Sequence, residues 1–149
     1  MAAVDFFLKI DGIDGESTDR DHKGEIDVLS FSWGEILQIS RGSGGGTGAG
    51  KVDIQDIHIT KFTDKSSPVL FLSCASGKHI PTAVLSGRNN RTGASGAQFY
   101  KITLSDCIIS SYQSGGSSGD AVPGDQFSIN FAKIEFNGNA FDTSGGTIG

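Results

Sequence analysis

Hydrophobic and polar residues alternate along several short segments of the chain, which is the pattern of β-strands that bury one face. The first segment, residues 6–10, is followed by the turn signals Asp11-Gly12 and Asp14-Gly15 and by a polar loop over residues 16–24. Further strands are predicted at residues 52–62, 79–88, 98–112 and 126–136. The chain is therefore predicted to be mainly β.

The clearest alternation covers residues 25–39 and predicts one long strand. It places Leu29, Phe31 and Trp33 on the face toward the core, where Trp33 is predicted to be an anchor. The opposite face carries Val28, Ser30, Ser32 and Gly34. Because Ser30 and Ser32 are small and uncharged, we predict that they border water, as in the lining of a pore.

Two predicted strands change the phase of their alternation. Val52 and Ile54 share one parity, whereas Ile57 and Ile59 share the other. A bulge, or a strand that crosses between two sheets, would produce this change. The same change separates Phe127, Ile129 and Phe131 from Ile134 and Phe136. Long strands that change face are typical of barrels and sandwiches.

One helix is predicted at residues 69–75, with Ser66 or Ser67 as its cap, Pro68 in its first turn and Gly77 at its end. The predicted fold is a single-domain β-barrel of two sheets over residues 1–149. It has one flanking α-helix and a long Gly-rich hairpin loop. The Gly-rich tail from about residue 138 has the composition of a flexible segment.

Composition and charge exclude several kinds of partner. Apolar residues make up 36% of the chain and charged residues 19%, and the formal net charge is -5. The sequence has no basic stripe, which argues against nucleic acid and anionic membrane surfaces. No apolar run approaches the roughly 18 residues of a membrane-spanning helix. The N-terminus lacks the basic and apolar regions of a secretory signal peptide, so export by that route is not expected.

The segment Gly45–Lys51 matches the first seven positions of a phosphate-binding loop, but Val52 stands where Ser or Thr would bind magnesium. Such a loop must open a helix, and this one precedes a predicted strand. Nucleotide binding is therefore disfavoured. The segment is better explained as a long hairpin loop that contacts other subunits.

No catalytic residue, metal site or cofactor is predicted. His22, His58 and His79 are scattered and lack metal-ligand spacing, and the acidic residues of the first loop fit a solvated charge run. These acidic residues are Glu16, Asp19, Asp21, Glu25 and Asp27. Cys74 and Cys107 are read as two small buried side chains, with a single disulfide as the alternative.

Several motifs in order resemble the Hcp (haemolysin-coregulated protein) family of type VI secretion. They begin with Asp5-Phe6-Phe7-Leu8-Lys9-Ile10, Gly15-Glu16-Ser17 and Glu25-Ile26-Asp27-Val28. They continue through Ser32-Trp33-Gly34, Gly50-Lys51-Val52, Asp64-Lys65-Ser66, Ser76-Gly77-Lys78-His79 and Asn130-Phe131-Ala132. The resemblance covers residues 5–134. The chain departs from the family at its end, where Phe141-Asp142-Thr143 replaces a final strand that carries a second Trp.

The resemblance implies a non-enzymatic β-barrel subunit that forms homohexameric rings. The rings stack into a tube inside a contractile sheath, a VgrG-type spike caps the tube, and secreted effectors travel in the lumen. Such a protein assembles in the bacterial cytoplasm and is secreted without a cleaved signal peptide. Ser30 and Ser32 are then predicted to face the lumen. The predicted ring-stacking loop contains Arg41, Gly45, Gly46, Gly48 and Lys51.

Two other functions are compatible with this fold. One is an effector-binding chaperone or receptor ring, and the other is the tube protein of a phage-like contractile injection system. A toxin or hydrolase built on the same barrel would need an appended catalytic domain, for which 149 residues leave no room.

Overall fold

The computed structural model describes residues 4–41, 47–89, 97–119, 122–143 and 146–148. Within these ranges the chain forms eleven β-strands and one α-helix, as the sequence predicts for a mainly β protein. In chain order the elements are β1 (Val4–Ile10), β2 (Ile26–Val28), β3 (Ser30–Ser32), β4 (Glu35–Arg41), β5 (Thr47–Ile54), β6 (Ile57–Phe62), α1 (Ser66–Ser76), β7 (Ile80–Asn89), β8 (Ala97–Gly115), β9 (Gly124–Phe136), β10 (Asn139–Asp142) and β11 (Gly146–Ile148).

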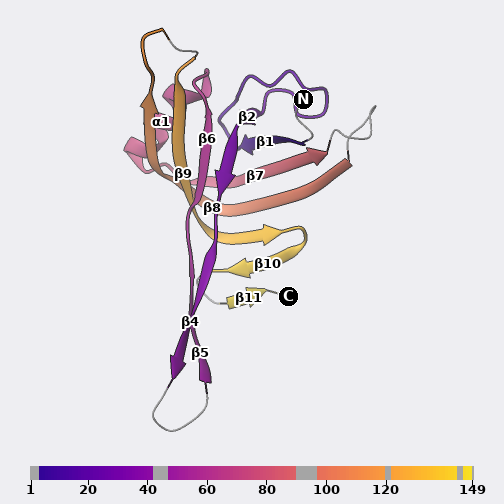
Figure 1. The fold of residues 1–149 in the computed structure, drawn as a ribbon, viewed down its shortest axis with the longest axis vertical. Coiled ribbons are helices and arrows are strands. Elements are labelled where there is room, and N and C mark those ends of the chain that lie inside the picture. The colour runs from indigo at the N-terminus through magenta and orange to yellow at the C-terminus, as the bar shows by residue number, and fades with distance from the viewer. Residues whose placement is uncertain (1–3, 42–46, 90–96, 120–121, 144–145, 149) are drawn as a thin grey trace.

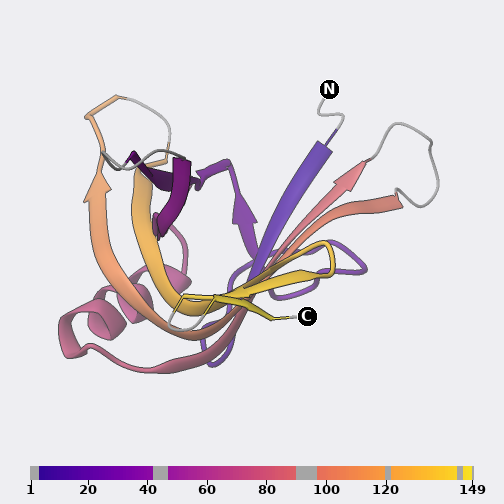
Figure 2. The same cartoon turned by 90° about the horizontal axis from the view of Figure 1, so that it is seen from below.

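Nine strands form one antiparallel sheet that curls into a nearly closed barrel. The sheet runs β11-β10-β9-β8-β7-β1-β2, and β6 pairs with both β9 and β3. The backbone N–H of Leu29, between β2 and β3, donates to the carbonyl of Thr60 in β6 at 2.8 Å and so draws the two ends of the sheet together. Figure 2 shows β8 and β9 curving through the molecule, with α1 on one side and the ends of β1 and β7 on the other. The predicted barrel is confirmed.

β4 and β5 form a separate two-stranded sheet, here called the arm, which projects from the barrel at the opposite end from α1 (Figure 1). Chain direction changes between β5 and β6, where the N–H of Gln55 donates to the carbonyl of Gly34 at 2.9 Å. The change of phase predicted within residues 52–62 is therefore a strand crossing between two sheets. The predicted second sheet is confirmed as this small arm.

The change of phase in β9 has another cause. Phe131 and Ile134 are both buried, although their parities differ. Their neighbour β8 contains Asp106 in a left-handed conformation, with φ 54°, and β7 places Pro81, which has no N–H, at the same level. The sheet bends there, and β9 exchanges β6 for β10 as its second neighbour.

The prediction of one long strand at residues 25–39 was wrong. The segment is divided into β2, β3 and β4, which pair with β1, β6 and β5 respectively. Leu29 lies at the first change of partner and is 52% exposed, so its assignment to the core face was also wrong. Phe31 and Trp33 do pack against the core, and the Trp33 indole N–H donates to the hydroxyl of Tyr100 at 3.0 Å.

The helix ends as predicted but begins differently. Gly77 adopts the left-handed conformation at the C-terminus, with φ 64°. Ser66 and Ser67 lie inside α1 rather than at its cap. The N-cap residue is Lys65, whose side chain makes no capping hydrogen bond; the carboxylate of the preceding Asp64 accepts the N–H of Ser66 at 2.9 Å, and the hydroxyl of Ser67 accepts the N–H of Asp64 at 3.0 Å.

The end of the chain, where the family pattern is lost, continues the barrel sheet. β10 pairs with β9, and β11 pairs with β10. Phe141 of β10 packs against the core. Two strands without Trp thus extend the sheet beyond β9, and β11 is the edge strand.

Gly15 tests how tightly the first loop is packed. A Cβ atom at this position would lie 2.4 Å from the backbone oxygen of Glu25, which cannot move aside as a side chain can. We expect Gly15→Ala to lower the free energy of unfolding by about 1–3 kcal/mol, as for other overpacked sites. Gly115→Ala is the control, because its Cβ would meet nothing within 4 Å. Equal urea midpoints for the two variants would contradict the close approach.

Candidate assembly surfaces

The strands β3, β6, β9 and β8 present a polar face to the outside of the barrel, here called the polar wall. Strand alternation produces it, because Ile57, Ile59, Phe127 and Ile129 point inward and are buried. Register aligns Ser30 with Thr60 and Ser32 with His58. The polar wall consists of Ser30, Ser32, His58, Thr60, Ser111, Gln113, Gln126 and Asn130, together with Ser128, which is buried and hydrogen-bonded to Ser110 and Ser111.

The predicted lumen residues Ser30 and Ser32 are both exposed and belong to the polar wall. The prediction missed His58, Thr60 and Gln126, which lie beside them in the register. The alternation of residues 57–62 could have predicted that His58 and Thr60 are exposed. Since Ile57 and Ile59 share the core face, His58 and Thr60 must lie on the other face.

Hydrogen bonds connect the side chains at one end of the polar wall. The hydroxyl of Ser128 lies 2.7 Å from that of Ser110 and 2.5 Å from that of Ser111. The carboxylate of Asp56 accepts the Ser110 hydroxyl at 2.6 Å and the Asn130 amide at 2.8 Å. These bonds fix side chains that would otherwise rotate freely.

Two adjoining hollows of about 260 and 220 Å³ lie on the polar wall and share Thr60, Gln113 and Gln126 as lining residues. Amide and hydroxyl groups both donate and accept hydrogen bonds, so this surface can contact peptide groups and polar side chains of many kinds. Among the described residues, no group of three His, Cys, Asp or Glu side chains is placed to hold a metal ion.

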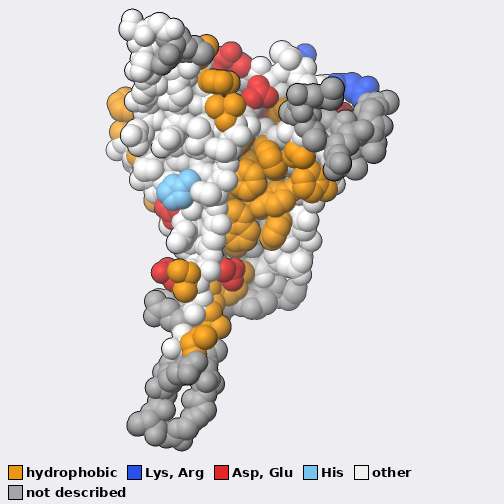
Figure 3. Space-filling model, viewed as in Figure 1, with side chains coloured by type: hydrophobic (Ala, Val, Ile, Leu, Met, Phe, Trp, Pro, Cys, Tyr) orange, Lys and Arg blue, Asp and Glu red, His pale blue; other side chains and the backbone are white. Residues whose placement is uncertain are grey.

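The arm exposes hydrophobic side chains. Ile36, Leu37 and Ile39 are 58%, 47% and 56% exposed, and Figure 3 shows hydrophobic side chains on the arm and over a broader area of the barrel above it. Half-buried aromatic rings of the barrel pack against its core. Tyr100 is their centre, with ring centroids 5.3 Å from Phe31 and 5.0 Å from Phe136.

The predicted stacking residues are distributed along the arm. Arg41 ends β4, Gly48 and Lys51 belong to β5, and Gly45 and Gly46 lie outside the described residues. The hairpin loop is shorter than predicted, because strand pairing continues to Arg41 and Thr47. The resemblance to a phosphate-binding loop also fails structurally, since a strand and not a helix begins at Thr47.

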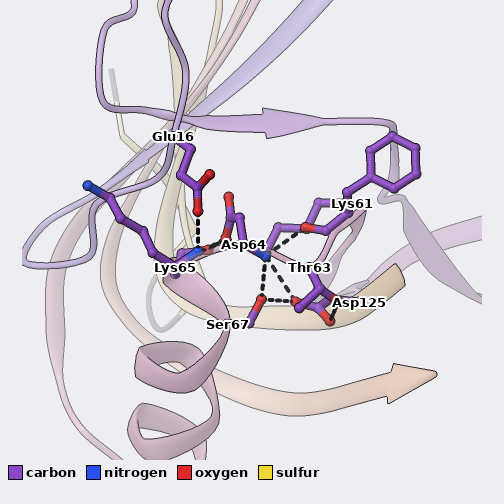
Figure 4. Close-up of polar contacts among 9 residues, drawn as sticks. Glu16, Lys61, Thr63, Asp64, Lys65, Ser67 and Asp125 are labelled. Atoms are coloured by element: carbon purple, nitrogen blue, oxygen red, sulfur yellow. Dashed lines mark hydrogen bonds and ion pairs between the residues drawn. The ribbon is translucent and has the colours of Figure 1, made fainter. Parts of the chain in front are cut away.

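Lys61 joins the barrel to α1 through a buried polar network (Figure 4). Its ammonium group, on a side chain with no exposed surface, donates to Asp125 and Asp64 at 2.9 Å and to the hydroxyl of Ser67 at 3.0 Å. Thr63 donates to the second oxygen of Asp125 at 2.8 Å, and Ser67 also donates to Asp125. The burial of Lys61 could also have been predicted from the sequence, because Lys61 shares the parity of the buried Ile57 and Ile59.

The environment of Asp125 favours its charged form. Burial by itself raises the pKa of this carboxyl, but hydrogen bonds from Ser67, Lys61 and Thr63 and the charge of Lys61 outweigh burial, and the pKa lies below its ordinary value. Because the folded pKa is the lower one, the stabilisation is present above the unfolded pKa. It is lost as pH falls through the folded pKa.

The acidic first loop is more structured than a solvated charge run. Arg88 donates to Asp19 at 2.8 Å through one nitrogen and also through a second, and these hydrogen bonds are the main reason that the pKa of Asp19 falls to about 2. His22 is buried, stacked on Phe7 with ring centroids 4.3 Å apart. The Glu16 carboxylate accepts the N–H of Lys65 at 2.6 Å. The prediction of solvated carboxylates was wrong for Asp19.

Both cysteines are free. Cys107 is fully buried, as predicted, and burial raises the pKa of its thiol to about 11. Cys74 is half-buried on α1. The alternative of a disulfide between them is therefore not realised.

Comparison with known proteins identifies the family. A family model described as "Type VI secretion system effector, Hcp" matches residues 7–137. The chain belongs to the Hcp family. It is 44% identical over 133 residues to Protein hcp1 of Pseudomonas aeruginosa, covering 89% of this chain and 82% of that protein.

Solved Hcp structures share the fold. Hcp1 from Salmonella typhimurium is 33% identical, with a TM-score of 0.82 over 98% of this chain and 99% of that one. A type VI secretion system effector from Yersinia pestis is 29% identical, with a TM-score of 0.72 over 97% and 95% of the two chains. Membership in the Hcp family means that the chain is a homologue of non-enzymatic type VI secretion tube proteins. None of the helices in the described residues is sufficiently long and apolar to cross a membrane.

Removing the Lys61 charge should disturb the whole Hcp domain. We expect Lys61→Met to lower the free energy of unfolding by about 3–5 kcal/mol, because it leaves Asp125 buried without its cation. The exposed Lys9 is the matched control, and Lys9→Met should change stability by less than about 0.5 kcal/mol. Urea unfolding followed by circular dichroism measures both. A change at Lys61 as small as that at Lys9 would refute the importance of the network.

Proposed function

We propose that this Hcp protein is a structural subunit that assembles into homohexameric rings, and that the rings stack into the inner tube of a type VI secretion machine. Effectors would travel in the lumen, a VgrG-type spike would cap the tube, and a contractile sheath would surround it. The subunit would assemble in the bacterial cytoplasm and leave the cell with the tube, without a cleaved signal peptide.

The observation that carries the proposal is the contrast between two kinds of surface on one small subunit. The polar wall is hydroxyl- and amide-rich, whereas the arm exposes Ile36, Leu37 and Ile39. Apolar surface of this kind marks contacts between proteins, and polar surface remains in water. A tube has this division, with subunit contacts around a wet channel. We therefore assign the polar wall to the lumen and the arm to contacts between subunits.

The symmetry of such an assembly follows from the kinds of contact. A head-to-tail contact closes into a ring when its rotation divides a full turn, and a contact along the ring axis continues without limit. The arm is suited to the second kind of contact, because it projects beyond the barrel (Figure 1). We assign the segment from Arg41 to Lys51 to the contact with the adjacent ring.

A receptor ring that binds and protects effectors is the second candidate. The hollows around Thr60, Gln113 and Gln126 favour it, because they give cargo a place to bind on the same polar wall. The two functions are compatible, since one lumen can bind effectors before it delivers them.

Ring and tube formation are tested directly by the mass of the purified protein. Light scattering should give a mass near six times 15.5 kDa, and negative-stain images should show rings that stack into tubes at high concentration. Gly48→Pro removes an N–H from β5 and should abolish stacking while leaving the ring mass unchanged. Gly48→Ala retains the N–H and is the control. A wild-type protein that remains monomeric at all concentrations would overturn the proposed function.

The position of the lumen is tested at Ser32. Ser32→Trp adds a bulky apolar side chain to the polar wall and should reduce the cargo that co-purifies with rings by about tenfold, which corresponds to a loss of about 1.4 kcal/mol of binding free energy. Arg20→Trp, at an exposed position away from the polar wall, should leave cargo unchanged. Quantitative mass spectrometry of the purified rings measures retention. Undiminished cargo on Ser32→Trp rings would reject the lumen assignment.

A further inference from the structure

The outer side of α1 is unusually apolar for a helix on the surface of a monomer. Val69, Phe71 and Leu72 are 39%, 55% and 63% exposed. No charged residue occurs between Ser66 and Ser76. A surface helix normally directs its polar residues outward, and a helix with an apolar outer face is one that another element covers.

The buried network explains why the helix is arranged in this way. Ser66, Ser67 and Ser73 are buried on the inner side, together with Leu70. Ser67 is held there by Lys61 and Asp125, and the hydroxyl of Ser66 donates to Asp64 at 2.5 Å. With three of its four serines on the inner side, α1 presents Val69, Phe71 and Leu72 to the outside.

Exposed lysines lie at both ends of α1, where the carboxylates of Glu16 and Asp106 also lie, and exposed carboxylates lie at the base of the arm. Lys65 precedes α1, Lys78 follows it, and both are exposed. The base of the arm carries two exposed carboxylates, Glu35 on the same face as Leu37 and Asp53 opposite Ile36 on the other face. An apolar surface with acidic neighbours is complementary to an apolar surface with basic neighbours.

The two surfaces of one chain cannot meet. Figure 1 places α1 and the arm near opposite ends of the long axis of the molecule, and the strands between them belong to one continuous sheet. A contact between them therefore requires two copies. Because the two surfaces differ, the contact is head-to-tail, which is the kind that builds rings and filaments.

We propose that the base of the arm of one subunit packs on α1 of a neighbouring subunit, with Leu37 against Val69 and Leu72 and with Glu35, on the same face of the arm as Leu37, near Lys65 or Lys78. This inference rests on the proposed function, since it names the partner surface of the same assembly. It assigns α1 to contacts between subunits.

Two charge-reversed variants test the contact. The arm variant carries Glu35→Lys, and the helix variant carries Lys65→Glu and Lys78→Glu. Each variant alone brings like charges together, so the protein concentration at half assembly should rise by about tenfold or more. Light scattering over a dilution series measures this concentration. Lys23→Glu with Lys101→Glu changes exposed lysines elsewhere by the same net charge as the helix variant and should assemble like the wild type.

Mixing the two variants gives the decisive result. In an equimolar mixture each reversed arm can meet a reversed helix of the other variant, so assembly should return to within about threefold of the wild-type concentration if the charge pairing holds. A mixture that assembles no better than the separate variants overturns the contact. Wild-type assembly of either variant alone also overturns it.

The exposed Leu72 decides the question if the charge variants do not fold. Leu72→Ser removes an apolar contact at a position that is 63% exposed in the single chain, so it should weaken assembly without lowering the unfolding temperature. Wild-type assembly of Leu72→Ser would refute the helix contact while leaving the proposed function intact. If the wild type itself does not assemble, the proposed function fails instead.

Discussion

The buried ion pair between Lys61 and Asp125 determines how the helix is attached to the barrel. Lys61 belongs to β6 and Asp125 to β9, and the hydroxyl of Ser67 connects both to α1. Burying these charges is expensive, and the pair is retained only because almost every donor and acceptor around it is satisfied. Among the described residues, no buried side-chain nitrogen or oxygen lacks a hydrogen-bond partner.

The network also determines which side of α1 reaches the surface. A helix attached through Leu alone could rotate about its axis, whereas one attached through Ser67 cannot rotate without breaking hydrogen bonds to a buried charge. The orientation of Val69 and Leu72 therefore depends on Lys61, although neither side chain is bonded to it in the network. In this way an interaction in the interior defines a surface that is available to a partner.

Alternation along the chain was sufficient to predict the strands of the barrel and the exposed face around Ser30 and Ser32, and the helix was predicted from Pro68 and Gly77, because each of these signals is local. It failed at Leu29, where the strand changes partner and the parity of buried residues changes with it. It also failed at Asp64, since both serines that follow were equally good caps by sequence and only the position of Asp125 draws Ser67 inward. Contacts between distant segments decided each of these cases.

The length of the arm also could not be predicted from local sequence alone. Glycines between Gly42 and Gly50 favour a loop, yet strand pairing extends to Arg41 and Thr47. A two-stranded hairpin alone is only marginally stable in water, and the exposed Ile36, Leu37 and Ile39 gain little from it. Their hydrophobic free energy is realised only when another surface covers them. The stability of the arm and the assembly of subunits are therefore expected to be coupled.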